Sequence, residues 1–202
     1  MFCLRAATDS AWAASAVKDL DAVLVDHAHC EMKAATNALS LVVRHSSDLG
    51  LVRALTELAR EELDHFQRVV DFLEARGLRL GPPPVDDYAA DLRRAMNALP
   101  ASELPLVTDR LLVGALIEAR SCERFKLLIQ ALPADCPADL RAFYDELFAC
   151  EARHYRQYVD LAVRTAGPLA SLVEGRLALL AEAEARIVRS LAQRDERGTV
   201  HG

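Results

Sequence analysis

The sequence predicts an all-α fold, a four-helix bundle built from two helical hairpins, on three observations. Ala, Leu, Arg and Glu dominate the 202 residues and only 5% are aromatic, a composition that favours helix over sheet. Long proline-free stretches alternate with turn signals rich in glycine and proline. One unit, a long helix, a short turn and a second long helix, occurs in each half of the chain.

Turn signals set the expected boundaries of the helices. The expected helices are at about 10–45, 48–76, 86–98, 103–131, 138–165 and 169–194. A proline-rich segment and the short 86–98 helix form a long crossover between the hairpins. Two hairpins joined by a long crossover are typical of a ferritin-like bundle, so we expect a single domain over 1–202 with its core at about 10–165.

Four helix ends have a local explanation in the sequence. Asp48 is expected to cap the second helix, because its carboxylate can accept from a free backbone N–H. Gly77 suits the end of that helix, since glycine enters the left-handed conformation without penalty. Ser102 is expected to cap the helix that follows, with Pro105 in its first turn. The helix after Pro168 is interpreted as an addition with Arg and Glu on its outer face.

Composition excludes several classes of protein. The formal charge is −6, with 24 basic and 30 acidic residues, so only a local basic patch would attract nucleic acid. We expect no membrane span, because no run of about 18 apolar residues occurs, and no signal peptide at residues 1–10. The five cysteines include no C-x-x-C pair, which argues against disulfides or a zinc thiolate site. A reduced, cytoplasmic setting is expected.

A duplicated Glu-x-x-His motif is the sharpest chemical signal. Glu62 and His65 lie in the second expected helix, and Glu151 and His154 lie in the fifth. Three residues rotate a helix by about 300°, so both side chains of each motif leave the same face, one turn apart. Each motif therefore offers one carboxylate and one imidazole to a common pair of metal ions.

Each hairpin should supply one more carboxylate from its other helix. The candidates are Asp26 or Glu31 in the first hairpin and Glu118 or Glu123 in the second; members of a pair lie about 140° apart around their helix. Facing residues of antiparallel helices lie at equal distances from the turn. Glu31 is 14 residues from its helix end and Asp26 is 19, against a return leg of 11. Glu118 is 12 residues away and Glu123 is 7, against a return leg of 13. The geometry favours Glu31 and Glu118.

The predicted ligand set therefore contains four carboxylates and two imidazoles, namely Glu31, Glu62, His65, Glu118, Glu151 and His154. Two divalent cations would neutralise the four negative charges, and this donor set suits iron or manganese. In the alternative interpretation, all six are solvated residues on helix faces. The largely apolar positions that flank them, such as Leu58 and Leu147, argue against that alternative.

Other polar residues near these motifs have open or structural interpretations. Asp26 and Glu123 either orient ligand imidazoles or form ordinary ion pairs. His27, His29 and His45 lack a Glu-x-x-His partner and are predicted not to be ligands. A last group is expected either to form surface ion pairs or to bind a phosphate backbone: Arg120, Arg124, Arg153 and Arg156. The thiols that neighbour acidic candidates are predicted to be packed between helices, namely Cys30, Cys122 and Cys150.

Four longer stretches contain these residues in more specific patterns. They are DHAHCEMKAA at 26–35, LAREELDHF at 58–66, GALIEARSCERF at 114–125 and CEARHY at 150–155. Together they resemble the MiaE family of tRNA hydroxylases, a branch of the ferritin-like di-iron superfamily, from about residue 19 to 163. The string EARSCERF is far more specific than Glu-x-x-His, which every branch shares.

The resemblance implies a reaction that spacing alone does not indicate. Such a protein would use O₂ and electrons from an external donor, a protein or reductase, to hydroxylate the isopentenyl group of 2-methylthio-N6-isopentenyladenosine next to the tRNA anticodon. The six ligands would hold two iron ions per chain. A base in an anticodon loop is a plausible target, because unpaired bases can be splayed into a pocket.

Two other functions remain open at this stage. One is a ferroxidase or peroxide-scavenging protein of the same fold, which would need a cage-forming surface or a rubredoxin-like cysteine module; the sequence contains no such module. The other is a non-catalytic interaction bundle, which would have no need of the six ligands.

Overall fold

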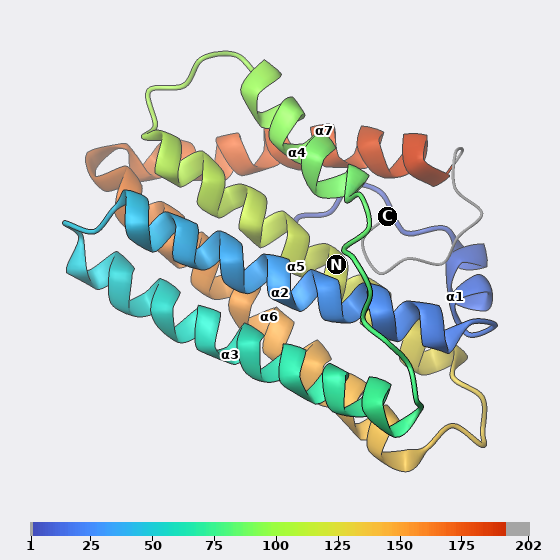
Figure 1. The fold of residues 1–202 in the computed structure, drawn as a ribbon. Coiled ribbons are helices and arrows are strands. Elements are labelled where there is room, and N and C mark those ends of the chain that lie inside the picture. The colour runs from blue at the N-terminus through green and yellow to red at the C-terminus, as the bar shows by residue number, and fades with distance from the viewer. Residues whose placement is uncertain (1, 193–202) are drawn as a thin grey trace. The chain divides into compact units, whose positions relative to one another are not determined.

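The computed structural model describes residues 2–192, and every regular element within that range is a helix. This confirms the all-α class (Figure 1). None of the helices in this range combines the length and the apolar character needed to cross a bilayer. The elements in chain order are α1 (Ser10–Ala16), α2 (Leu20–Arg44), α3 (Leu49–Ala75), α4 (Asp87–Ala98), α5 (Leu106–Ala131), α6 (Ala138–Ala166), η1 (Gly167–Leu172) and α7 (Val173–Ala192).

The described residues divide into two compact units, each with one of the predicted hairpins. The first-hairpin unit is Lys18–Val85 and contains α2 and α3. The second-hairpin unit comprises residues 2–17 and 86–192 and contains the remaining helices. The single-domain organisation expected from the sequence stays a prediction.

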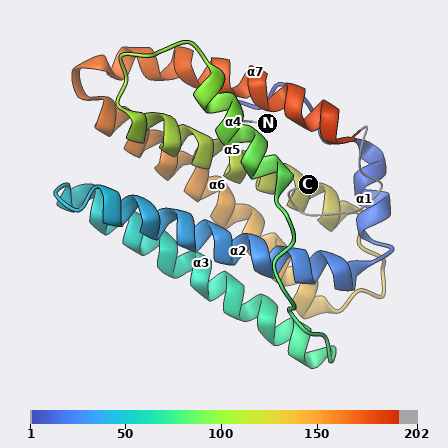
Figure 2. The same ribbon diagram turned by 45° about the horizontal axis from the view of Figure 1, so that its top comes forward.

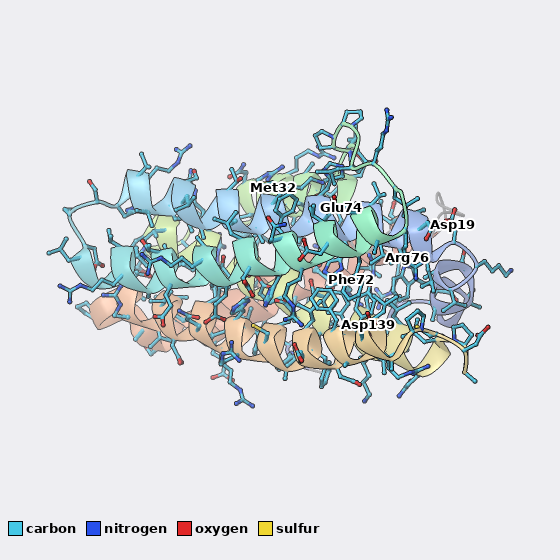
Figure 3. The ribbon with its side chains drawn as sticks, turned by 60° about the horizontal axis from the view of Figure 1, so that its bottom comes forward. Asp19, Met32, Phe72, Glu74, Arg76 and Asp139 are labelled. Carbon is cyan, nitrogen blue, oxygen red and sulfur yellow. The ribbon has the colours of Figure 1, made fainter. Side chains whose placement is uncertain are left out.

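The first-hairpin unit is an antiparallel pair of long helices whose ends follow from local sequence. Asp48 caps α3 as predicted, and its Oδ1 accepts from the backbone N–H of Leu51 at 2.9 Å. At the far end of α3, Gly77 has φ +67° and the N–H of Leu78 bonds the carbonyl of Leu73, which confirms the predicted glycine stop. Figure 3 shows Arg76 at the same end of the hairpin as Asp19.

The second-hairpin unit is built on α5 and α6, which lie side by side along their length (Figures 1 and 2). The helices α4 and α7 pack on each other and both contact α5, while α1 also packs on α5. Because α5 is contacted by all of them, it is buried almost all round its middle section, from Leu111 to Cys122. The middle of α5 is therefore the core of this unit.

Three predictions of local structure are wrong. The expected 10–45 helix is two helices, because the Asp19 carboxylate accepts from the N–H of Ala22 and starts a new helix there. Ser102 does not cap α5; its hydroxyl accepts from the N–H of Leu104 in the preceding turn, and the helix begins after Pro105. The start of the last helix is a 3₁₀ segment, Gly167–Leu172, and positions 193–194 of that prediction lie outside the described residues.

The helix α7 also differs from its predicted all-outward charge pattern. Two of its charged residues, Arg176 and Glu184, are 7% and 0% exposed. Each is buried because it meets an opposite charge on α5: Arg176 donates twice to Asp109 at 2.8 Å, and Glu184 accepts twice from Arg120 at 2.9 and 3.0 Å. The prediction holds for exposed residues such as Glu182 and Arg186.

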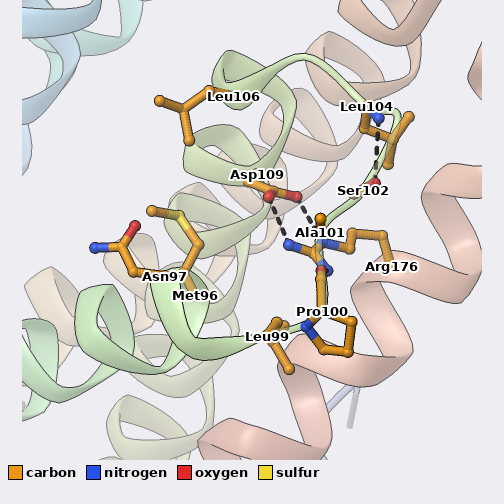
Figure 4. Close-up of a pocket in the computed structure, with 10 residues that line it drawn as sticks. All are labelled: Met96, Asn97, Leu99, Pro100, Ala101, Ser102, Leu104, Leu106, Asp109 and Arg176. Carbon is orange, nitrogen blue, oxygen red and sulfur yellow. Dashed lines mark hydrogen bonds and ion pairs between the residues drawn. The ribbon is translucent and has the colours of Figure 1, made fainter.

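The Asp109–Arg176 pair lies at the edge of a pocket of about 280 Å³ between α4, the 99–104 turn, α5 and α7 (Figure 4). The third guanidinium nitrogen of Arg176 donates to the carbonyl of Pro100 at 2.9 Å. Arg176 thereby ties the turn before α5 to α7, and we interpret this pocket as part of the helix-packing structure.

Candidate metal centre

The first triad consists of Glu31 from α2 and of Glu62 and His65 from α3. These side chains are 5%, 1% and 7% exposed, and one ligand atom from each lies within 4.8 Å of the others. The Nδ1 atom of His65 is 3.6 Å from Oε2 of Glu31 and 3.5 Å from Oε2 of Glu62. The first hairpin by itself thus gathers two carboxylates around one imidazole nitrogen.

The second triad has the same composition and consists of Glu118 from α5 and of Glu151 and His154 from α6. These side chains are 4%, 2% and 0% exposed, and their ligand atoms also lie within 4.8 Å of one another. Nδ1 of His154 is 3.4 Å from Oε2 of Glu151. Both histidines therefore turn the same ring nitrogen toward the carboxylates.

The hairpin geometry brings together the residues that the equal-leg argument selects. Glu31 joins the first triad and Glu118 the second. Glu123, by contrast, accepts from the backbone N–H and hydroxyl of Thr8 at 3.1 and 2.6 Å and pairs with Arg120. Of its two open interpretations, the structure favours an ordinary ion pair. Asp26 is half-buried, with the Cys30 thiol 3.9 Å from its Oδ2.

The chemistry of each triad fits a divalent cation. Two carboxylates held this close and away from water repel each other, and an isolated buried charge is costly. A bound cation removes both penalties, as an opposite charge within a few ångströms favours the ionised form. Carboxylate oxygens combined with imidazole nitrogen suit iron or manganese, and not a zinc thiolate site. Two triads sum to four carboxylates, which two divalent ions neutralise.

The nearby thiols do not have the properties of metal-bound thiolates. Burial raises the pKa of Cys122 well above its usual value, and the carboxylates of Glu151 and Glu118 raise it further, so this thiol stays protonated at neutral pH. Cys150 is 7% exposed, and its Sγ lies 3.5 Å from Nε2 of His154, on the side of the ring away from Glu151. Cys30 is buried as well.

The arginines named as phosphate-binding candidates fall into two groups. Arg120 is fully buried and donates to Glu184, and Arg124 is 6% exposed with its guanidinium 5.4 Å from the ring centroid of Trp12. Because neither reaches the surface, both are withdrawn as candidates. Arg153 and Arg156 are exposed on α6 and stay candidates.

One residue near the first triad has a role that the sequence analysis missed. His27 is 0% exposed, and its Nε2 is 2.6 Å from Oε1 of Glu31. The missed signal was the i, i+4 spacing, which places two side chains on one face of a helix. His29, two residues on, instead contacts the backbone carbonyl of Leu80 at 3.1 Å.

Comparison with known proteins places this geometry in a family. A family model described as tRNA-(MS2IO6A)-hydroxylase (MiaE) matches residues 1–198. A tRNA 2-(methylsulfanyl)-N(6)-isopentenyladenosine(37) hydroxylase of Pseudomonas putida strain KT2440 is 43% identical over 155 residues, covering 77% of this chain and 72% of that protein. The hydroxylase of the same description from Salmonella typhimurium strain LT2 is 28% identical over 236 residues, covering 93% of this chain and 84% of that protein.

A solved structure confirms the ferritin-like fold that the sequence predicts. It is described as "Protein 43 with aldehyde deformylating oxygenase activity from Synechococcus" and is similar to this chain with a TM-score of 0.86 and 38% identity. The similarity covers 100% of this chain and 96% of the other. With two Glu and Glu-x-x-His triads, a ferritin-like fold and a family match over 198 residues, the chain belongs to the MiaE family of tRNA hydroxylases.

Proposed function

We propose that this protein is an O₂-dependent, non-haem di-iron monooxygenase. It hydroxylates the isopentenyl group of 2-methylthio-N6-isopentenyladenosine next to the anticodon of tRNA. The observation on which the proposal rests is the pair of buried Glu and Glu-x-x-His triads in a chain of the MiaE family. The P. putida and S. typhimurium relatives have names that state the same substrate.

The proposed iron ligands are the six residues of the two triads, three from each hairpin, with two iron ions per chain. Glu31, Glu62, Glu118 and Glu151 would supply the oxygen ligands. His65 and His154 would supply Nδ1, the nitrogen that each ring turns toward the carboxylates. Iron bound by these residues would supply the activation of O₂, which protein side chains cannot perform themselves.

The chain's own residues bind the metal and exclude water from it. Leu58 and Leu147, one turn before each Glu-x-x-His motif, are 0% and 1% exposed, so apolar side chains border both triads. Such a lining suits the apolar isopentenyl group of the proposed substrate. It also protects a reactive centre from side reactions with solvent.

The overall reaction requires partners outside this chain. One oxygen atom of O₂ enters a C–H bond of the isopentenyl group and the other leaves as water. This consumes two electrons and two protons, which we assign to an external donor protein or reductase. A tRNA substrate places the reaction in the cytoplasm.

The decisive experiment supplies iron-loaded, reduced protein with O₂ and tRNA that contains 2-methylthio-N6-isopentenyladenosine. The RNA is then digested and its nucleosides are weighed by mass spectrometry. We expect the modified adenosine to gain one oxygen atom, and we expect no gain without O₂ or without reductant. If iron-loaded protein consumes O₂ and leaves the nucleoside unchanged, the tRNA proposal is wrong and a ferroxidase or peroxide-scavenging activity becomes the better explanation.

A further inference from the structure

The two triads match in composition but differ at one position four residues before the first ligand. In α2 this position is His27, ahead of Glu31; in α5 it is Gly114, ahead of Glu118. The difference has a packing reason in the second hairpin. A Cβ atom on Gly114 would lie 2.8 Å from the ring of Tyr158, so the tyrosine fills the space that a side chain at 114 would need. Tyr158 itself lies four residues after His154.

The first hairpin uses the same space in the opposite way. The position four residues after His65 is Val69, which is 0% exposed and far smaller than tyrosine. An imidazole on the facing helix fits where the second hairpin has a phenol ring. His27 fills that position and is itself 0% exposed.

The contact between His27 and Glu31 is short and directed. Nε2 of His27 is 2.6 Å from Oε1 of Glu31, and Oε2 of the same carboxylate lies 3.6 Å from Nδ1 of His65. An ionised carboxylate only accepts hydrogen bonds, so Nε2 of His27 is the donor. The two oxygens of Glu31 therefore have separate tasks: Oε1 is held by His27, and Oε2 faces the triad.

We propose that His27 is a positioning residue that holds Glu31 so that only Oε2 is presented to metal. The inference rests on the metal site of the proposed function. A hydrogen bond to the outer oxygen restricts rotation of the carboxylate and fixes it as a monodentate ligand. Partners that orient a metal ligand in this way typically change metal affinity by about 10- to 100-fold when they are removed. The consequence is an intrinsic inequality between the half-sites built by the two hairpins.

The test compares His27→Leu, which removes the donor, with His27→Gln, whose amide N–H can replace it. The matched control is His29→Leu, because His29 is also buried on α2 but contacts the Leu80 carbonyl. Ferrous iron is the probe, added without O₂ and titrated against a competing chelator. Mössbauer spectra of ⁵⁷Fe-loaded protein and thermal unfolding of the iron-free protein complete the set.

We expect His27→Leu to bind one of its two iron ions at least about tenfold more weakly than wild type and to alter one of the iron environments in the spectrum. His27→Gln should restore most of both, and His29→Leu should change neither, even if it lowers the unfolding temperature. Should His27→Leu not fold, His27→Met removes the donor with a more flexible side chain.

Two results would overturn the inference, and they are distinguishable. If wild type binds two iron ions and His27→Leu binds them with the same affinity and spectrum, the role of His27 is wrong while the metal centre stands. If wild-type protein binds no iron at all, the proposed function fails together with the inference.

Discussion

Carboxylates and imidazoles of the two triads are expensive groups to bury, and their burial is the strongest physical argument for a metal. Each triad holds two acidic side chains that are at most 5% exposed. In each hairpin, the ligand atoms come from two different helices and still lie within 4.8 Å. Without a cation, such a cluster would gain stability from replacement by apolar residues.

Removal of a single ligand should therefore release iron without unfolding the chain. We expect Glu62→Ala and His154→Ala each to lower iron content well below two ions per chain and to abolish O₂ consumption, because each variant leaves the metal under-coordinated. Metal analysis after loading with ferrous iron measures the effect.

The control for these variants is Asp64→Ala, since Asp64 lies between Glu62 and His65 in sequence but is exposed. It should retain full iron content. Unchanged iron in both ligand variants, or stoichiometric zinc with no iron binding by wild type, would remove the basis for the proposed centre.

At the scale of elements, the C-terminal helix α7 is held to α5 by buried ion pairs. Arg120 and Glu184 are both 0% exposed, and the same Glu184 carboxylate accepts from the hydroxyl of Tyr88 on α4 at 3.0 Å. Arg120 also donates to the carbonyl of Ala6 and the hydroxyl of Thr8, at 2.9 and 3.0 Å. One guanidinium thus joins α5, α7 and the segment before α1.

Loss of this guanidinium should destabilise the protein strongly. Arg120→Met leaves the Glu184 carboxylate buried without its partner, and breaking a buried pair in this way costs about 3–5 kcal/mol. Urea unfolding measures the change, with Arg186→Met, an exposed residue of the same helix, as the control that should stay within about 0.5 kcal/mol of wild type. A loss below about 1 kcal/mol for Arg120→Met would show that the pair is unimportant for stability.

The close packing of α5 on α6 depends on a glycine. Gly114→Ala would place a methyl group 2.8 Å from the ring of Tyr158, which is 1% exposed and has no room to move. We expect a loss of about 1–3 kcal/mol of unfolding free energy from the overpacking. Circular dichroism during urea titration would detect it.

The matching change elsewhere should have the opposite sign. Gly175 lies near the start of α7 with no atom within 4 Å of an added Cβ. Gly175→Ala should raise stability by up to about 1 kcal/mol, because alanine restricts the unfolded chain and favours helix. Equal effects of the two substitutions would mean that helix propensity, and not contact with Tyr158, decides the result.

For the whole molecule, an acidic protein of net charge −6 must bind an acidic nucleic acid. Two divalent ions would offset the four ligand carboxylates, so the remaining surface is less acidic than the formal charge. We expect tRNA binding to weaken as salt rises, with the log of affinity falling by about 0.9 or less per contacted phosphate for each log unit of salt. Binding measured across salt concentrations gives this slope.

Reversal of an exposed charge on α6 should reduce binding and leave the metal in place. Arg156→Glu is the preferred variant, because Arg156 is exposed, whereas Arg153 also donates to the Cys150 sulfur at 3.1 Å. We expect weaker tRNA binding, a shallower salt slope and full iron content. Arg186→Glu makes the same change of charge on α7; if it weakens tRNA binding equally, the effect is one of net charge and Arg156 makes no specific contact.

Local features of the fold could be predicted because they depend on nearest neighbours along the chain. Asp48 caps α3 and Gly77 ends it through atoms a few residues away. The break at Asp19 was missed, although the cap is equally local, because Ala-rich sequence on both sides of it hid the boundary. The equal-leg rule selected Glu31 and Glu118 because antiparallel helices of known rise leave little freedom of register.

The sequence by itself determined the helical class, the two hairpins and the three acidic and basic donors of each triad, since helix periodicity and turn length are properties of short stretches. Only the tertiary structure decided which charges turn inward. Arg120, Arg176 and Glu184 look like surface residues in sequence and are buried in the fold. A charge can leave water only where an opposite charge from a distant segment meets it, and the spacing of residues within one helix does not contain that information.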